Sequence, residues 1–166
     1  MGFATLCIRS HGAITMMTII EKVLLLQDVD VLSGMTSEQL PFVAAIAQET
    51  SVQPDWVIYR EGVPPDGLYV VVSGSVRMQR GKEEIDRIMP NGAFGIWALF
   101  DNEPRLTTAI AAEESRLLFV SRERFFDVLS DHVDIVEGIL KQLAQRLRRL
   151  ASAVDKNYAL SDSVDR

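Results

Sequence analysis

The chain has 166 residues, of which 48% are hydrophobic and 24% charged, an ordinary composition for one soluble globular domain with its own core. This composition excludes a disordered tail, a collagen-like fibre and a disulfide-stapled miniprotein, and the single cysteine, Cys7, favours a reducing, cytoplasmic location. The net charge of -6 argues against non-specific binding to nucleic acid, which needs many cations to neutralise phosphates.

The two ends of the chain lack the patterns of a folded domain. Residues 1–16 carry Arg9 and His11 in their midst and do not have the layout of a signal peptide, so we expect a disordered leader there. Residues 155–166 are expected to form a polar tail. No stretch approaches the ~18 uncharged apolar residues that a membrane span needs, so none is expected.

Residues 18–48 show the helical period of hydrophobic residues. A second helix within this zone is predicted to begin at Thr36, because Gln39 follows at the spacing of a capping box. Pro41 lies so close to that start that we expect an irregular first turn. The first helix collects four apolar side chains on one face: Ile19, Ile20, Val23 and Leu24.

Residues 50–120 change to a period of two, and turn residues follow at short intervals. Arg80-Gly81-Lys82 predicts a hairpin tip, and Asn91-Gly92, the strongest short hairpin signal, predicts a second one. Many short strands with such turns are typical of an antiparallel β-roll or jelly roll, the double-stranded β-helix. The expected strands include Val57–Tyr59, Leu68–Val72, Val76–Met78, Ala109–Ala112 and Leu117–Val120.

After this zone the helical period returns. Ser121 is placed to cap a short helix and Asp131 to cap a longer one. We therefore expect a mainly β domain over residues 17–154, with an N-terminal helical segment and C-terminal helices over 122–154, the second of them long. That long helix carries an apolar stripe at spacings of three and four: Val133, Val136, Ile139, Leu140, Leu143, Leu147 and Leu150.

The segment from Gly92 to Thr108 is the most informative part of the chain. It combines a glycine-bearing turn, a one-turn helix and an arginine that returns on the next strand. Free backbone N–H groups at a helix start bind anions, and Arg105 beside them can grip a phosphate with two parallel hydrogen bonds. A surface ion pair is the commoner role for such an arginine, so both interpretations stay open.

The same segment resembles the phosphate-binding cassette of the cyclic nucleotide-binding domain, found in catabolite-activator-type regulators, kinase regulatory subunits and gated channels. The residues in register are Phe94-Gly95, Ala98-Leu99, Pro104-Arg105 and Thr108. The segment Val31–Thr36 and the glycine-punctuated strands around Gly74 resemble the same family. The resemblance implies that no cofactor is required and that cyclic AMP or another cyclic nucleotide binds at Phe94, Gly95, Ile96, Trp97, Ala98, Leu99, Pro104, Arg105, Leu106, Thr107 and Thr108.

Two positions depart from the family's pattern. In that family the cassette arginine, here Arg105, pairs with the cyclic phosphate, and a glutamate after the Phe-Gly pair binds the ribose 2′-hydroxyl. This chain has Ile96 at the glutamate position, and Leu106 where the family has a small or hydroxylated residue. A missing acceptor costs about 1–3 kcal/mol, so weak, altered or lost nucleotide binding is expected.

The remaining polar residues do not indicate an enzyme or a metal site. The strand region contains no histidine, and Cys7 has no clear histidine partner that would make it a nucleophile. His132, at a helix start, is interpreted as a solvated surface residue. Asp55, Glu61 and Asp66 are interpreted as turn and rim residues.

Two functions stay open. A ligand-sensing regulatory module would dock a nucleotide on Arg105 and shift its C-terminal helix, whereas a ligand-free structural module would dimerise or regulate a partner protein. A free Arg105 guanidinium facing a cavity favours sensing, and an internal salt bridge or a filled cavity favours the structural module. In either case we expect a homodimer through the C-terminal helix. Only 16 residues (166 − 150) follow Leu150, too few for a helix-turn-helix domain, so direct DNA binding is not expected.

Overall fold

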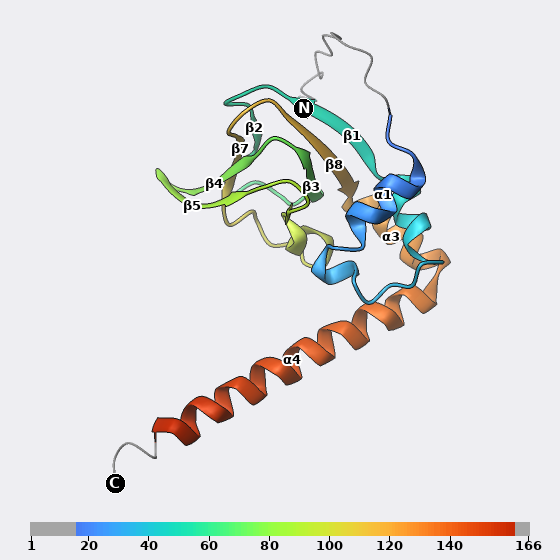
Figure 1. The fold of residues 1–166 in the computed structure, drawn as a ribbon, viewed down its shortest axis with the longest axis vertical. Helices are drawn as coiled ribbons and strands as arrows, with labels where there is room; N and C mark the ends of the chain where they lie inside the picture. The colour runs from blue at the N-terminus through green and yellow to red at the C-terminus, as the bar shows by residue number, and fades with distance from the viewer. Residues whose placement is uncertain (1–15, 162–166) are drawn as a thin grey trace.

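The computed structural model describes residues 16–161, and the side chains of residues 16–152. A body of strands and short helices carries a long C-terminal helix that runs away from it (Figure 1). The predicted leader lies outside the described residues except for Met16. The long helix continues to Ser161, so it is longer than the predicted end at residue 154.

In the described part of the chain, eight strands form two four-stranded antiparallel sheets, which confirms the predicted β-roll with flanking helices. One sheet has the order β1-β8-β3-β6 and the other β2-β7-β4-β5. The strands are β1 (Gln48–Val52), β2 (Val57–Tyr59), β3 (Gly67–Ser73), β4 (Val76–Arg80), β5 (Glu83–Ile88), β6 (Ala93–Phe94), β7 (Thr108–Ala111) and β8 (Ser115–Ser121).

One of the two predicted hairpins is present. Arg80-Gly81-Lys82 joins β4 to β5, and these strands pair with each other. The hairpin predicted at Asn91-Gly92 is wrong, because β5 pairs with β4 whereas β6 pairs with β3 in the other sheet. Asn91 does adopt a left-handed φ of 68°, as the turn chemistry requires, but the turn leads the chain from one sheet to the other.

Helix α1 (Ile19–Leu26) leaves most of its predicted apolar face exposed, including Ile20 and Leu24. The buried side instead includes Lys22, whose Nζ donates a hydrogen bond of 2.8 Å to the Ala47 carbonyl. Because the helix is apolar around much of its circumference, its period alone does not show which side the body covers.

Helix α2 (Leu40–Ile46) begins four residues after the predicted start, and the short 3-10 helix η1 (Asp30–Leu32) precedes it. The Thr36 N–H does donate a hydrogen bond of 2.9 Å to the Gln39 side chain, but this pair closes a turn ahead of the helix. Pro41 lies in the first helical turn, where its missing N–H leaves no partner unsatisfied, so the proline does not require the irregular first turn that was predicted.

Helices α3 (Arg122–Asp131) and α4 (Val133–Ser161) are separated by His132, whose φ of -132° and ψ of 78° interrupt the helical backbone. Of the two capping predictions, the one for Ser121 is right in position and the one for Asp131 is wrong. Ser121 occupies the N-cap position of α3 but makes no hydrogen bond there with its side chain, and Asp131 is the last residue of α3.

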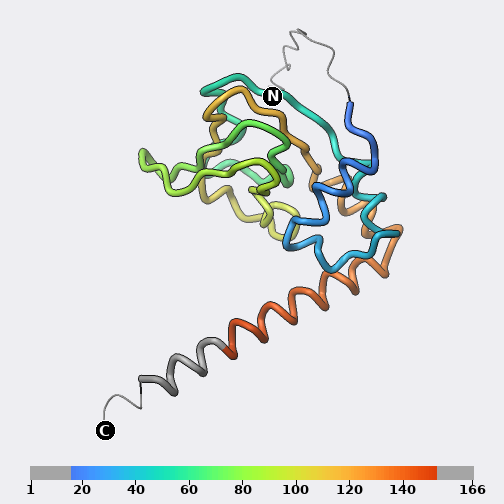
Figure 2. Tube along the Cα trace, in the orientation of Figure 1, coloured from blue at the N-terminus to red at the C-terminus, as the bar shows by residue number. Residues whose placement is uncertain are grey.

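The first turns of α4 lie against the body, next to the segment that contains η1 (Figure 2). His132 is half-buried rather than solvated as predicted, because its ring stacks on Phe42 at a centroid distance of 3.8 Å. The backbones of Gly34 and Gly138 also touch: a Cβ added to Gly138 would lie 3.0 Å from the Gly34 carbonyl oxygen. Side chains larger than glycine would force α4 away here.

Alternation along β3 divides the core into two clusters. Leu68 and Val70 pack against the helices, whereas Tyr69 and Val71 point into the interior of the roll between the two sheets. Phe125 of α3 is fully buried in the helix-side cluster. The same strand therefore supports both the helices and the wall of the roll.

We expect Phe125→Ala to lower the free energy of unfolding by about 3–5 kcal/mol, because removing a fully buried ring leaves a cavity. The adjacent Phe126 is 41% exposed, so Phe126→Ala is the matched control and should cost about 1 kcal/mol or less. Urea denaturation followed by circular dichroism measures both. Equal losses would contradict this assignment of the buried face of α3.

Candidate functional site

A cavity of about 920 Å³ opens on the roll beside the predicted cassette. Two predicted site residues do not line it: Leu99 is fully buried in the core, and the Thr108 hydroxyl accepts a hydrogen bond from the Glu61 N–H at 3.0 Å. The other predicted residues all line the cavity: Phe94, Gly95, Ile96, Trp97, Ala98, Pro104, Arg105, Leu106 and Thr107.

The cassette turn depends on Gly95, which has a φ of 71°. A Cβ added at this position would lie 2.4 Å from Nη1 of Arg105, so only glycine allows the guanidinium to approach so closely. The predicted one-turn helix follows as the 3-10 helix η2 (Ile96–Leu99). Its buried Leu99 anchors it in the core, while Trp97 remains 63% exposed at the cavity.

The Arg105 guanidinium is held by the protein itself. Its side chain is only 4% exposed and forms an ion pair with Asp66. Nη1 donates a hydrogen bond of 3.1 Å to the Gly95 carbonyl, and Nη2 donates one of 2.7 Å to the Gly67 carbonyl. The Tyr59 ring completes this environment, with its centroid 4.1 Å from Cζ of Arg105. The structure thus combines an open cavity with an internal ion pair.

Asp66 is the functional residue whose role the sequence analysis missed. Its carboxylate is half exposed, and its second oxygen accepts a hydrogen bond of 2.7 Å from the Tyr69 hydroxyl. In the sequence it belongs to a Pro-Asp-Gly turn, and that local pattern was sufficient to explain an aspartate. Nothing local indicated that its partner, Arg105, stands 39 residues further along the chain.

The two tyrosines around this ion pair are held in their neutral form. Burial raises the pKa of Tyr69 far above its usual value, and the neighbouring Asp66 carboxylate raises it further. Burial also raises the pKa of Tyr59, although the Arg105 charge opposes this shift. Tyr69 therefore stays protonated near neutral pH and donates its hydroxyl hydrogen to Asp66.

Much of the cavity wall comes from strands that the sequence analysis did not connect with the cassette. The alternation of hydrophobic residues along these strands showed that each strand has two faces. The packing of the two sheets against each other decides which of these faces lines a cavity. The additional lining residues are Tyr59, Glu61, Gly62, Pro65, Met78, Arg80, Ile85, Asp86, Ile88, Ala93, Asp101 and Glu103.

No described group of three or more His, Cys, Asp or Glu side chains is arranged to hold a metal ion, and no described helix could span a membrane.

Residues 49–132 match the sequence profile of the cyclic nucleotide-binding domain. The chain belongs to this family. The CRP-like cAMP-activated global transcriptional regulator of Mycobacterium tuberculosis is 36% identical over 97 residues, which are 55% of this chain and 43% of that regulator. The cAMP-dependent protein kinase regulatory subunit of Hypocrea atroviridis is 26% identical over 117 residues, 70% of this chain and 24% of the subunit. The matched regions are less than half of either relative.

Solved structures show the same fold. The N-terminal domain of a transcriptional regulator from Streptomyces coelicolor has a TM-score of 0.72 and 26% identity, and covers 78% of this chain and 96% of that domain. A cyclic nucleotide-binding-like protein from Brucella abortus has a TM-score of 0.59 and 28% identity, and covers 66% of this chain and 97% of that one. The family resemblance predicted from the cassette residues is therefore confirmed.

We expect Arg105→Ala to lower the free energy of unfolding by about 2–4 kcal/mol, because it leaves the Gly95 and Gly67 carbonyls without their donor. Arg80 lines the same cavity but is exposed, so Arg80→Ala should change stability by no more than about 0.5 kcal/mol. Chemical denaturation compares the two. If both variants are as stable as the parent, the guanidinium does not hold the cassette in place.

Proposed function

We propose that this domain is a regulatory sensor rather than an enzyme, in which the cavity binds a small molecule and α4 carries the response to a second copy of the chain. The observation that carries this proposal is the open cavity of about 920 Å³, walled by the cassette of the family. This proposal is supported by the names of two relatives, a transcriptional regulator and a kinase regulatory subunit.

Cyclic nucleotides bind this cavity weakly in the proposed sensor, for two reasons. A cyclic phosphate would have to compete for Arg105 with Asp66, which already neutralises the guanidinium. Ile96 lines the cavity but offers no acceptor to a ribose hydroxyl. Both features leave the cavity open to a ligand while removing the contacts that would favour a sugar phosphate.

We expect cyclic AMP to bind Ile96→Glu up to about 10- to 100-fold more tightly than the parent, because the glutamate restores an acceptor worth about 1–3 kcal/mol. Ile96→Leu, which keeps an apolar side chain, is the matched control and should bind like the parent. Asp66→Asn should also strengthen binding, since it frees the Arg105 charge. Calorimetry with cyclic AMP and cyclic GMP measures all four proteins.

The Arg105–Asp66 ion pair favours a second candidate, a ligand-free dimerisation module that regulates a partner protein. In that case the guanidinium is a structural element and the cavity has no occupant. The calorimetric series distinguishes the two candidates for nucleotides: if neither the parent nor Ile96→Glu nor Asp66→Asn binds one, nucleotide sensing is excluded.

The predicted stripe on α4 divides into two parts. Ile139, together with Ile135 beside it, is buried against the helix-side core, so this part covers the chain's own body. The remaining residues follow a seven-residue repeat. Leu143 among them packs partly against the same core, whereas Val133, Leu140, Leu147 and Leu150 are exposed. We propose that two copies pair through this seam, which has Val133, Leu140 and Leu147 at its a positions and Val136, Leu143 and Leu150 at its d positions.

The parent should have twice the mass of one 18.5 kDa chain in light scattering at high micromolar concentration. Leu140→Glu/Leu147→Glu should give the monomer mass, because it places two charges in the apolar seam. Leu24→Glu, on the exposed face of α1, is the control and should leave the mass unchanged. A monomeric parent would contradict the proposed dimer.

A further inference from the structure

Three large apolar side chains surround the cavity and remain exposed. Trp97 and Leu106, both in the cassette, are 63% and 67% exposed, and Ile85 of β5 is 47% exposed. Single exposed apolar residues are ordinary, but several around one cavity mark a surface that a ligand covers. Because Trp97 offers a flat aromatic face, the group that covers it best is another apolar body.

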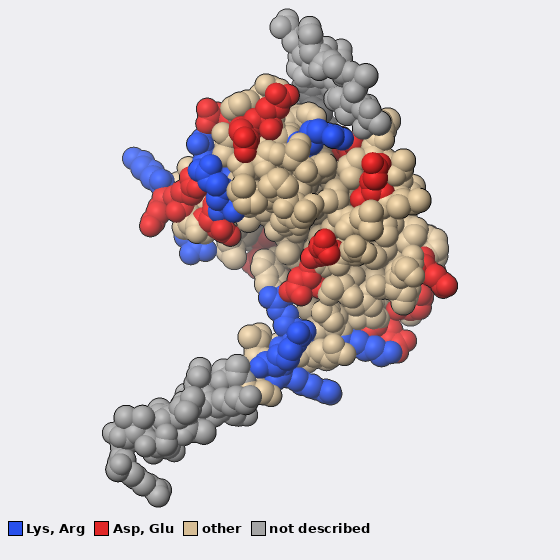
Figure 3. Space-filling view, in the orientation of Figure 1, with Lys and Arg blue, Asp and Glu red and all other residues tan. Residues whose placement is uncertain are grey.

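The charges in this cavity are predominantly negative. Four carboxylates line it against two guanidinium groups, and one of these guanidinium groups is already paired with Asp66. Figure 3 shows acidic side chains beside basic ones over the β4–β5 hairpin, which forms one wall. An anionic ligand would meet net repulsion here. The four carboxylates belong to Glu61, Asp86, Asp101 and Glu103, and the guanidinium groups to Arg80 and Arg105.

Arg105 lines the cavity but does not require an anionic ligand. The residue is only 6% exposed and lines the cavity, yet its Nε–H has no hydrogen-bond partner among the described residues. A buried donor without a partner is costly, but this Nε has almost no accessible surface, so a ligand in the cavity does not reach it. Its charge, in contrast, is already balanced by Asp66, so no anion is needed.

We propose that the cavity binds an apolar organic cation, with its ring system against Trp97 and Leu106 and its positive group among the carboxylates. The inference rests on the proposed sensor function, because the same cavity is the site, and it adds the chemical class of the ligand. The exposed face of Trp97 favours a cation in the same way, through the negative face of its ring.

Three probes that share a naphthalene ring test the charge: (2-naphthylmethyl)trimethylammonium, 2-naphthalenemethanol and 2-naphthalenesulfonate. Calorimetry on the full chain at low salt should show the cation binding at least about tenfold more tightly than the sulfonate, with the alcohol between them. At high salt the cation and the sulfonate should approach the alcohol, because the carboxylates are screened. Trp97→Ala should weaken binding of all three probes.

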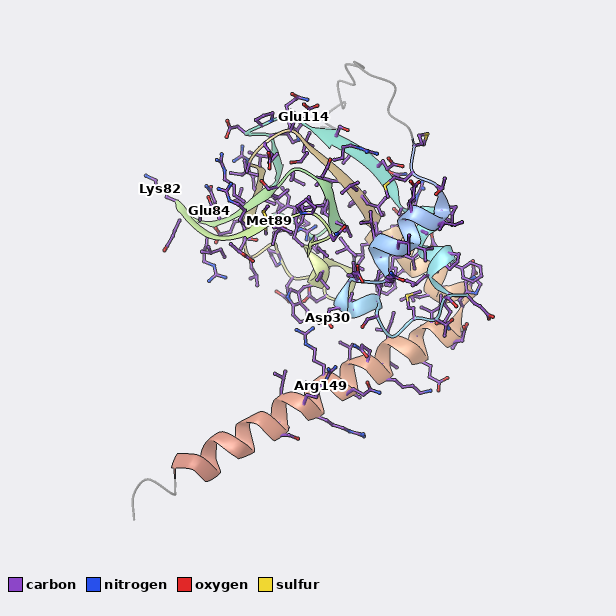
Figure 4. All side chains as sticks on the ribbon, in the orientation of Figure 1. Asp30, Lys82, Glu84, Met89, Glu114 and Arg149 are labelled. Carbon is purple, nitrogen blue, oxygen red and sulfur yellow. The ribbon has the colours of Figure 1, made fainter. Side chains whose placement is uncertain are left out.

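Substitutions that remove negative charge from the cavity measure how much its carboxylates contribute to binding of the cation. Asp86→Asn/Glu103→Gln should weaken binding of the cation about three- to tenfold and leave the alcohol unchanged. Glu83→Gln/Glu114→Gln removes the same charge outside the cavity and should change neither; Figure 4 shows Glu114 on the roll well away from η2. A sulfonate that binds as tightly as the cation overturns the inference and leaves the sensor function standing. If no probe and no nucleotide binds, both fail.

Discussion

The ion pair between Arg105 and Asp66 joins two parts of the chain that are 39 residues apart in sequence. Because the Gly95 and Gly67 carbonyls accept from the same guanidinium, it links the cassette turn to the start of β3. The left-handed Gly95 leaves the space that this arrangement requires. Arg105, to which the resemblance assigns phosphate binding, therefore holds together the two segments that flank the cavity.

This constraint also decides the electrostatics of the cavity. A guanidinium neutralised by Asp66 no longer offsets the carboxylates around it, so the charge of the cavity is predominantly negative. Ile96, Trp97 and Leu106 give the same wall apolar contacts. The charge and the apolar lining favour the same class of ligand, so the departures at Ile96 and Leu106 are compatible with the proposed sensor.

Helix α4 is the element through which the proposed sensor reaches a second copy. Its first turns are docked on the body by the contact between Gly34 and Gly138, by a hydrogen bond of 2.9 Å from Gln142 to the Ser33 hydroxyl, and by the ion pair of Asp30 with Arg146. Figure 4 shows Asp30 facing this helix. The proposed seam begins within these docked turns and continues past them to Leu147 and Leu150, which are exposed, so a movement of the docked turns would change where the seam points.

The sequence by itself determined the elements that depend on local geometry: the strands of period two, the β4–β5 hairpin, the cassette turn and the apolar stripe of the last helix. Backbone dihedrals and side-chain period are set by neighbouring residues, so these predictions were correct. Only the tertiary structure decided which strands meet across Asn91-Gly92, which side of α1 is buried, and that Asp66 pairs with Arg105. Such pairings depend on contacts between distant segments, and a turn or a helix of the same local sequence is compatible with several of them.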